Sequence, residues 1–130
     1  MQQDSPEEFC PFCHPHTQTV VATHKSVYAI ADRNPVSEHH LLIIPLRHCK
    51  DYFAMTPEEH QDARELIQIM AQDIQAKDPS VTGFNIGANC GADAGQTIFH
   101  THIHLIPRRS SDTPCPRGGV RGVIPDKMNY

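Results

Sequence analysis

Residues 100–107 read HTHIHLIP, with histidine at positions 100, 102 and 104 and an apolar pair and a proline after the last histidine. Side chains alternate between the two faces of a β-strand, so this spacing predicts a strand whose histidines share one face. Phe99, Thr101, Ile103 and Leu105 share the other face, which can pack against a helix. The histidine face then looks into a cleft or onto solvent, where it is available for chemistry.

The same spacing argues against one metal ion held by all three histidines. On a strand that rises about 3.3 Å per residue, the Cα atoms of His100 and His104 are about 13 Å apart, whereas zinc binds imidazole nitrogen at about 2.0–2.1 Å. A neutral imidazole is a nucleophile toward phosphorus, and a protonated neighbour donates to a leaving oxygen. We therefore expect a division of labour, against the alternative that one or two histidines only satisfy backbone groups.

The rest of the chain predicts an α+β domain with a mostly antiparallel sheet of about five strands and one long helix. Residues 19–24 and 26–32 have the pattern of a hairpin with a break at Lys25. Residues 40–48 form an apolar run typical of a buried strand, with Pro45 at the sheet margin or a bulge. Residues 83–89 predict another strand, which runs into a glycine-rich loop, and the histidine strand covers residues 97–107.

The helix and the C-terminal segment have distinct boundary signals. Thr56, Pro57 and Glu59 match a capping box with proline in the first helical position, and the helix should end before Pro79. Pro107 should close the histidine strand. The residues that follow are rich in proline and glycine, so residues 108–130 are expected to form an extended C-terminal tail.

Length and composition indicate one globular domain over residues 1–130, in which residues 1–8 are expected to be disordered. The chain has 130 residues, five cysteines, 38% hydrophobic residues and a formal net charge of −4. No apolar run approaches the roughly 20 residues of a membrane span, and no secretory signal is recognisable, so we expect a cytoplasmic protein with no membrane partner. The acidic balance argues against a nucleic-acid partner.

HTHIHLI matches the His-φ-His-φ-His-φφ signature of the histidine triad (HIT) family, in which φ is an apolar residue, with Thr101 at the first φ position. AGQT at 94–97 sits where that family has its glycine-Gln-Ser/Thr stretch. The resemblance runs through CPFC, AIADRNPVSEHHLLIIPLRH and NIGANCGADAGQTIFHTHIHLIPRR, and so covers most of the chain. It implies a HIT-like fold, a nucleotide hydrolase or transferase acting through a nucleotidylated histidine, and a homodimer.

By position, the resemblance implies that His102 is the nucleophile and that His104 contacts the phosphate or the leaving oxygen. His40 would orient the site, and the residue before it, His39, stands where the family usually has glycine. The resemblance also implies a set of nucleotide-binding residues for the ribose, the phosphates and the base: Asp32, Asn89, Gly95, Gln96, Thr97, Phe12 and Leu42.

Cys10 and Cys13 of the CPFC segment admit three interpretations. A glutaredoxin-type redox motif lies between a strand and a helix, and the acidic polar residues before CPFC are unsuited to that strand. Free thiols beside a turn are the second interpretation, and a structural zinc site completed by two distant histidines is the third. The resemblance to zinc-containing family members favours the third and implies His48 and His100 as the remaining ligands. Two further histidines lie close enough in sequence to compete, His14 and His16.

AGQT followed by HLIPRR resembles the dinucleoside polyphosphate hydrolase branch of the family more than the phosphoramidase branch. It implies attack on the α-phosphate of a substrate such as diadenosine tetraphosphate, with release of a nucleoside monophosphate and with magnesium arriving, if at all, on the substrate. Four arginines are candidates for the distal phosphates or are simply solvated: Arg108, Arg109, Arg117 and Arg121. The alternatives are a nucleoside phosphoramidase or nucleotidyltransferase, a regulatory nucleotide-binding module with little turnover, and a metalloprotein with catalytic zinc on His102 and His104.

Overall fold

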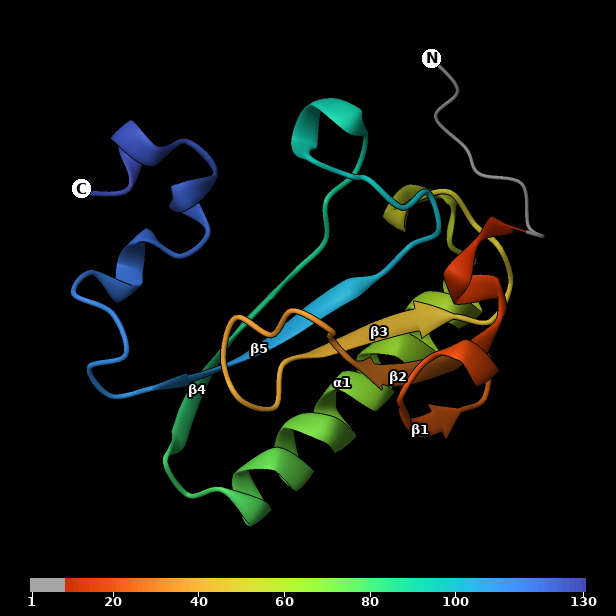
Figure 1. Cartoon of the computed structure of the whole chain (residues 1–130), viewed down its shortest axis with the longest axis horizontal. Coiled ribbons are helices and arrows are strands. Elements are labelled where there is room, and N and C mark those ends of the chain that lie inside the picture. The colour runs from red at the N-terminus through yellow and green to blue at the C-terminus, as the bar shows by residue number, and fades with distance from the viewer. Residues whose placement is uncertain (1–8) are drawn as a thin grey trace.

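The computed structural model describes residues 9–130, so the expected disorder of residues 1–8 lies outside the described part of the chain. Its strands form one antiparallel sheet in the order β1-β2-β3-β5-β4, and one long helix, α1, lies across one face of it (Figure 1). This confirms the predicted α+β class. The elements are β1 Val20–His24, β2 Val27–Ala31, β3 Leu41–Pro45, α1 Pro57–Lys77, β4 Val81–Gly87 and β5 Ile103–Arg109.

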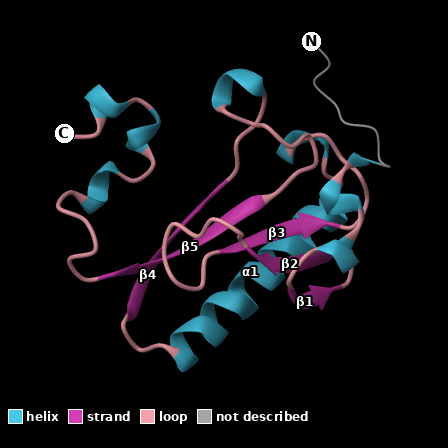
Figure 2. Ribbon diagram, in the orientation of Figure 1, coloured by secondary structure: helices cyan, strands magenta, loops and turns pink. Residues whose placement is uncertain are grey.

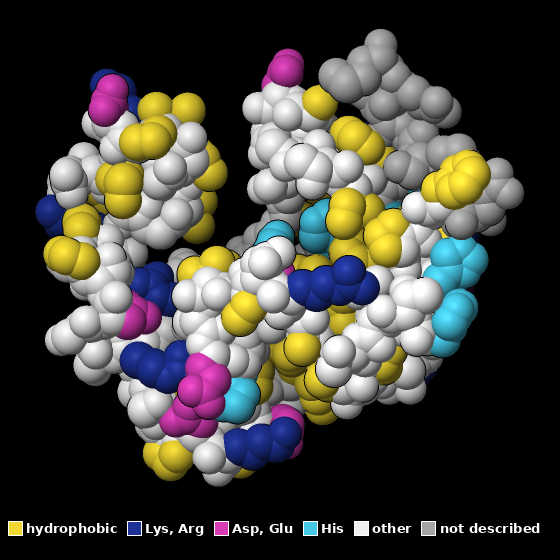
Figure 3. Space-filling model, in the orientation of Figure 1, with side chains coloured by type: hydrophobic (Ala, Val, Ile, Leu, Met, Phe, Trp, Pro, Cys, Tyr) yellow, Lys and Arg dark blue, Asp and Glu magenta, His cyan; other side chains and the backbone are white. Residues whose placement is uncertain are grey.

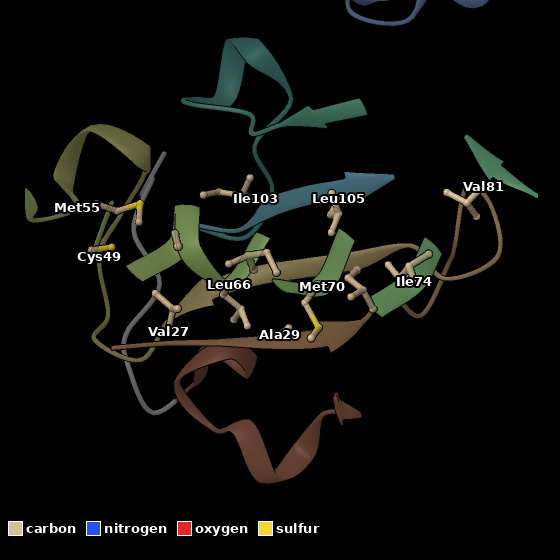
Figure 4. Packing of buried hydrophobic residues seen from close by; sticks show 13 residues of the cluster. Val27, Ala29, Cys49, Met55, Leu66, Met70, Ile74, Val81, Ile103 and Leu105 are labelled. Atoms are coloured by element: carbon tan, nitrogen blue, oxygen red, sulfur yellow. The ribbon is translucent and has the colours of Figure 1, made fainter. Parts of the chain in front are cut away.

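The helix begins at the predicted capping box. Thr56 Oγ1 accepts the amide of Glu59 at 3.1 Å, and the Glu59 carboxylate accepts the amide of Thr56 at 2.9 Å, while Pro57 takes the first helical position. The cap residue Asp78 ends the helix immediately before Pro79. The buried face of α1 packs on one face of the sheet, as Figure 4 shows for Leu66, Met70, Ile74, Val27, Ala29, Ile103 and Leu105.

The opposite face of β2 and β3 is also covered. Tyr28, Ile30, Leu42 and Ile44 pack there against the N-terminal segment that carries Cys10 and Phe12. Burial on both faces explains why β3 reads as an uninterrupted apolar run, LLIIP. The Tyr28 hydroxyl donates to the Phe12 carbonyl, which fixes the short 3-10 turn Pro11–Cys13 against the sheet.

The histidine strand is shorter than predicted at its start. β5 begins at Ile103, because the amide of Thr101 donates to the Cys49 carbonyl at 2.8 Å and the preceding segment follows that loop instead of a neighbouring strand. His100 and His102 therefore precede the strand, and only His104 lies in it. Pro107 does not close β5: it is buried opposite Phe84 of β4, and the strand continues to Arg109. β4 itself covers 81–87 and not 83–89.

The C-terminal segment is folded where the sequence predicted an extended tail. After β5 it bends through three short 3-10 turns, Pro116–Gly118, Arg121–Val123 and Pro125–Lys127 (Figure 2). Proline begins two of them, because its fixed φ suits the first position of a helical turn. The guanidinium carbons of Arg117 and Arg121 lie 4.9 and 4.7 Å from the centre of the Tyr130 ring, which ties the turns together. Within residues 9–130, no helix has the length and apolar character that crossing a membrane requires.

Candidate active site

His40 and His104 form the central contact of the candidate active site. His40 Nδ1 accepts the amide of Val36 at 3.0 Å, which leaves the ring proton of the neutral imidazole on Nε2. That nitrogen lies 2.9 Å from His104 Nδ1 and 3.4 Å from an Asp32 carboxylate oxygen. His104 Nδ1 is therefore the acceptor, and His104 carries its own proton on Nε2. Burial lowers the pKa of both rings below the ordinary 6.5, so both are neutral at neutral pH.

His102 adopts the opposite tautomer. Its Nδ1 lies 2.9 Å from the carbonyl oxygen of His100, which can only accept, so the proton is on Nδ1 and Nε2 keeps its lone pair. Burial lowers the pKa of this ring as well. Phe12 packs edge-on against the His102 ring. The ring centroids of His102 and His104 lie 5.6 Å apart. One imidazole thus presents a lone pair on Nε2, and its neighbour presents a proton on Nε2.

A cavity of about 210 Å³ lies beside these rings. Five residues singled out from the sequence line it: Phe12, Asp32, Leu42, His102 and His104. The Asp32 carboxylate accepts the amide of Asn34 at 2.8 Å, so the turn after β2 fixes its position. Sequence reasoning missed the other lining residues Pro11, Gln18, Ile30, Arg33, Asn34 and Ile98. Of these, Ile30 was detectable, because alternation along β2 places it on the same face as Tyr28.

The predicted phosphate loop does not line this cavity. Gln96 is buried: its amide nitrogen donates to the carbonyls of Lys50 and Ile98 at 2.7 and 3.1 Å, and its oxygen accepts the amide of Gly91 at 2.8 Å. The Gln96 side chain therefore closes the loop, and its amide nitrogen donates both of its hydrogen bonds within the protein. Gly95 has a φ of +93°, and a Cβ there would lie 3.3 Å from Asn89 Nδ2, so the close approach of these two residues requires glycine. Asn89 and Thr97 are exposed on the same loop.

Cys10, Cys13, His48 and His100 form a second cluster, in which one ligand atom from each lies within 4.8 Å of all the others. His100 Nδ1 is 3.3 and 3.4 Å from the two sulfur atoms, and His48 Nδ1 is 3.2 Å from Cys13 Sγ. A tetrahedral ion with bonds of about 2.3 Å to sulfur and about 2.0–2.1 Å to nitrogen needs separations of this size. The donor set therefore fits a zinc ion.

The surroundings of His100 suit a metal ligand. Its Nε2 donates to the Pro45 carbonyl at 2.7 Å, so Nδ1, on the side of the thiols, is unprotonated. Burial lowers the pKa of this histidine to about 4, which keeps the ring neutral. The two competing histidines, His14 and His16, are not in the cluster, and their rings pack on each other instead.

No group of three or more potential metal ligands in the described chain includes His102. Asp32, His40 and His104 do form such a group, but the Val36 amide holds the His40 proton on Nε2, the nitrogen that would have to bind the ion. The described residues therefore form no ligand cluster that contains both His102 and His104, as the alternative of catalytic zinc would require.

The four arginines proposed for the distal phosphates lie elsewhere. Arg108 donates to both carboxylate oxygens of Asp112, at 2.9 and 2.8 Å, and to Asn85 Oδ1 at 2.6 Å. Arg109 is bound to Asp78 at 2.9 Å, and the remaining two stack on the C-terminal tyrosine. None of them lines the cavity beside His102.

A five-stranded antiparallel sheet with one long helix and a row of histidines beside a cavity is the architecture of a histidine triad protein. The HIT domain matches residues 15–111, and the chain belongs to the HIT family. Residues 112–130, which make up most of the C-terminal tail, lie beyond the matched region.

Named relatives and a solved structure agree with this assignment. A bis(5′-nucleosyl)-tetraphosphatase of Schizosaccharomyces pombe is 37% identical over 84 residues, 65% of this chain and 46% of that protein. Adenylylsulfatase HINT3 of Arabidopsis thaliana is 40% identical over 83 residues, 64% of this chain and 42% of that protein. Both names denote hydrolases, and the chain spans less than half of either. A zinc-bound histidine triad family protein from Mycobacterium smegmatis superposes with a TM-score of 0.76 at 28% identity, covering 83% of this chain and 81% of that one.

Proposed function

We propose that this chain hydrolyses nucleotides at the α-phosphate through a covalent intermediate on His102. The observation that carries the proposal is the pair of opposite tautomers: His102 Nε2 has a lone pair, and His104 Nε2 has a proton. A nucleophile needs the first and stabilisation of a leaving oxygen needs the second. The cavity supplies Phe12 and Leu42 for a base and the Asp32 carboxylate for the ribose hydroxyls.

The reaction has two displacements. In the first, His102 Nε2 bonds to the α-phosphorus, the bond from phosphorus to the bridging oxygen breaks, and its electron pair leaves with the departing phosphate. The His104 Nε2 proton makes a hydrogen bond to the charge that develops on oxygen. In the second, a water oxygen bonds to phosphorus, the phosphorus–nitrogen bond breaks, its electron pair returns to Nε2, and a water proton passes to solvent.

A dinucleoside polyphosphate is the substrate class we favour, because the HLIPRR stretch resembles that branch of the family and one relative is named a tetraphosphatase. Diadenosine tetraphosphate would give AMP and ATP. Magnesium, where it takes part, would come with the polyphosphate.

The test is incubation of the purified chain with diadenosine tetraphosphate, adenosine 5′-phosphoramidate and adenylyl sulfate in parallel, with nucleotide products separated by chromatography. We expect the tetraphosphate to be cleaved fastest, and an adenylyl adduct on the intact protein by mass spectrometry. His102→Ala should show neither turnover nor adduct, whereas His16→Ala, outside the site, should show both. Nucleotide binding without turnover by the unmodified chain would favour the regulatory module, and full activity of His102→Ala would contradict the mechanism.

We further propose that Cys10, Cys13, His48 and His100 bind one structural zinc ion. The support is the matching donor set and the zinc-bound relative of known structure. Bound there, zinc would tie the N-terminal turn to the segment just before His102. We also propose a reducing compartment such as the cytoplasm, where cysteines that bind zinc are not oxidised to disulfides.

A homodimer is the assembly we propose, formed along β4. This strand is at the edge of the sheet, with Ile86 52% exposed beside a cavity of about 640 Å³ that α1 also lines. An edge strand with an exposed apolar side chain is a surface on which a second copy can add its own strand. Ile86→Glu should give a monomer in light scattering, whereas Ile69→Glu, which alters a similarly exposed isoleucine of α1, should leave a dimer.

A further inference from the structure

Another cavity, of about 420 Å³, lies between the C-terminal tail and the β4–β5 pair; we call it the tail cavity. Six of its lining residues matter for its chemistry: Val36, Asn85, Ile106, Arg108, Pro116 and Met128. Figure 3 shows the tail standing across a hollow from the segment that follows β4, with histidine side chains beside the floor of that hollow. The mechanism above makes no use of the tail cavity.

The tail cavity and the cavity beside His102 lie on the same face of the sheet. Alternation along β5 puts His104, Ile106 and Arg108 on one face, because Ile103 and Leu105 pack under the helix. His104 lines the first cavity, and the other two line the tail cavity. Strand β5 therefore leads directly from His104 into the tail cavity.

The neighbouring elements connect the two cavities in the same way. In β3, Leu42 is opposite His104 and lies under the first cavity, whereas in β4, Asn85 is opposite Ile106 and lines the tail cavity. The turn after β2 borders both, with Asp32 on the first cavity and Val36 on the second. A ligand held at Asp32 and reacting at His102 would thus extend across β5 toward β4 and the tail.

The lining of the tail cavity suits an uncharged flat group better than a phosphate. Arg108 already donates to both Asp112 oxygens and to Asn85, so its charge is compensated within the protein. Val36, Ile106 and Met128 offer apolar surface, and the volume is in the range of pockets that bind small molecules. A purine base with its ribose has the required apolar faces and polar edges.

We propose that the tail cavity binds the second nucleoside of a dinucleoside polyphosphate, the half that leaves when His102 attacks. This rests on the proposed function. The first nucleoside lies beside Asp32, the phosphate chain crosses β5 at His104, and the second base packs on Ile106 beneath the tail. From His104 to Arg108 the strand spans about 13 Å, a separation that several linked phosphates bridge.

The matched ligands are diadenosine tetraphosphate and adenosine 5′-tetraphosphate, which differ by the second adenosine. Both are titrated calorimetrically into the His102→Ala protein, so that no turnover is needed. We expect the dinucleotide to bind at least about tenfold more tightly. Gly122→Leu in the same background should remove this difference in affinity, because Gly122 lines the cavity and the added side chain takes the ligand's space. A Cβ at this position would lie 3.7 Å from Met128, an ordinary contact distance, so the backbone can accept a side chain there.

Val123→Leu is the matched control, since it puts the same side chain into the same turn at an exposed position outside the cavity lining, and it should keep the difference. Ile106→Ala should reduce the difference without touching the tail. Equal affinity for the two ligands, or a preference that survives both Gly122→Leu and Ile106→Ala, overturns the inference. Absence of hydrolysis by the unmodified chain would contradict the proposed function alone, because this readout is binding.

Discussion

His40 Nε2 lies 2.9 Å from His104 Nδ1, so the two rings share one proton along a single hydrogen bond. Because the Val36 amide donates to His40 Nδ1, the shared proton is on His40 Nε2. A second proton on either ring would place two donors face to face, in a site where burial already opposes a charge. The contact is therefore stable only while both histidines are neutral.

This arrangement predicts a specific dependence of stability on pH. The pKa of each of these histidines is lower in the folded chain than the ordinary 6.5, so the unfolded chain binds more protons as pH falls below 6.5. Their contribution to the free energy of unfolding is complete above about pH 6.5 and is lost below it. Urea unfolding from about pH 8 to about pH 5 should show this loss, and His40→Gln should reduce its slope. An unchanged slope in that variant would contradict the prediction.

The zinc proposal predicts a selective loss of metal. Elemental analysis of the purified protein should find about one zinc per chain, and Cys10→Ser should bind far less because three ligands remain. Cys115→Ser, which alters a thiol in the tail bonded to Asn129, should keep the ion, and so should His102→Ala. Chelation should also lower the melting temperature of the unmodified chain. Zinc lost on replacing His102 would instead indicate a catalytic ion.

The backbone conformation of His39 predicts that glycine at this position gives a more stable protein than valine. Its φ is +75°, a left-handed conformation that costs an L-residue about 1–2 kcal/mol and glycine almost nothing. His39→Gly should therefore be more stable than His39→Val by about 1–2 kcal/mol in chemical denaturation, even though glycine enlarges the entropy of the unfolded chain. Glu38→Gly and Glu38→Val, at the preceding residue with ordinary φ, are the control pair and should not show this order.

Thr101 stands at a position of the family signature that is usually apolar, and we expect its hydroxyl to stabilise the fold. Its Oγ1 donates to the buried Cys49 carbonyl at 3.0 Å and lies 3.2 Å from Cys49 Sγ. Thr101→Val keeps the shape but loses this bond, so the free energy of unfolding should fall by about 1–2 kcal/mol. Thr101→Ser keeps the hydroxyl and should lose less. Equal effects of the two variants would show that packing, and not the hydrogen bond, holds this segment.

Much of the fold could be predicted because its signals are local. The capping box at Thr56, the hairpin around Lys25 and the buried run LLIIP each depend on residues within a few positions, and the structure has all three. The start of β5 and the folding of the tail could not be predicted in this way. The first depends on a bond between Thr101 and Cys49, and the second on arginines that meet Tyr130.

In the candidate site, too, part could be predicted from the sequence and part depends on the tertiary structure. The sequence alone determined which side chains have the chemistry: histidines at alternate positions, a carboxylate after β2, and two thiols three positions apart. Only the tertiary structure decided what each of them can do. The His100 carbonyl puts the proton of His102 on Nδ1, and the Val36 amide, through His40, puts that of His104 on Nε2. The imidazoles are identical in the sequence, and one presents a lone pair while the other presents a proton because their hydrogen-bond partners differ.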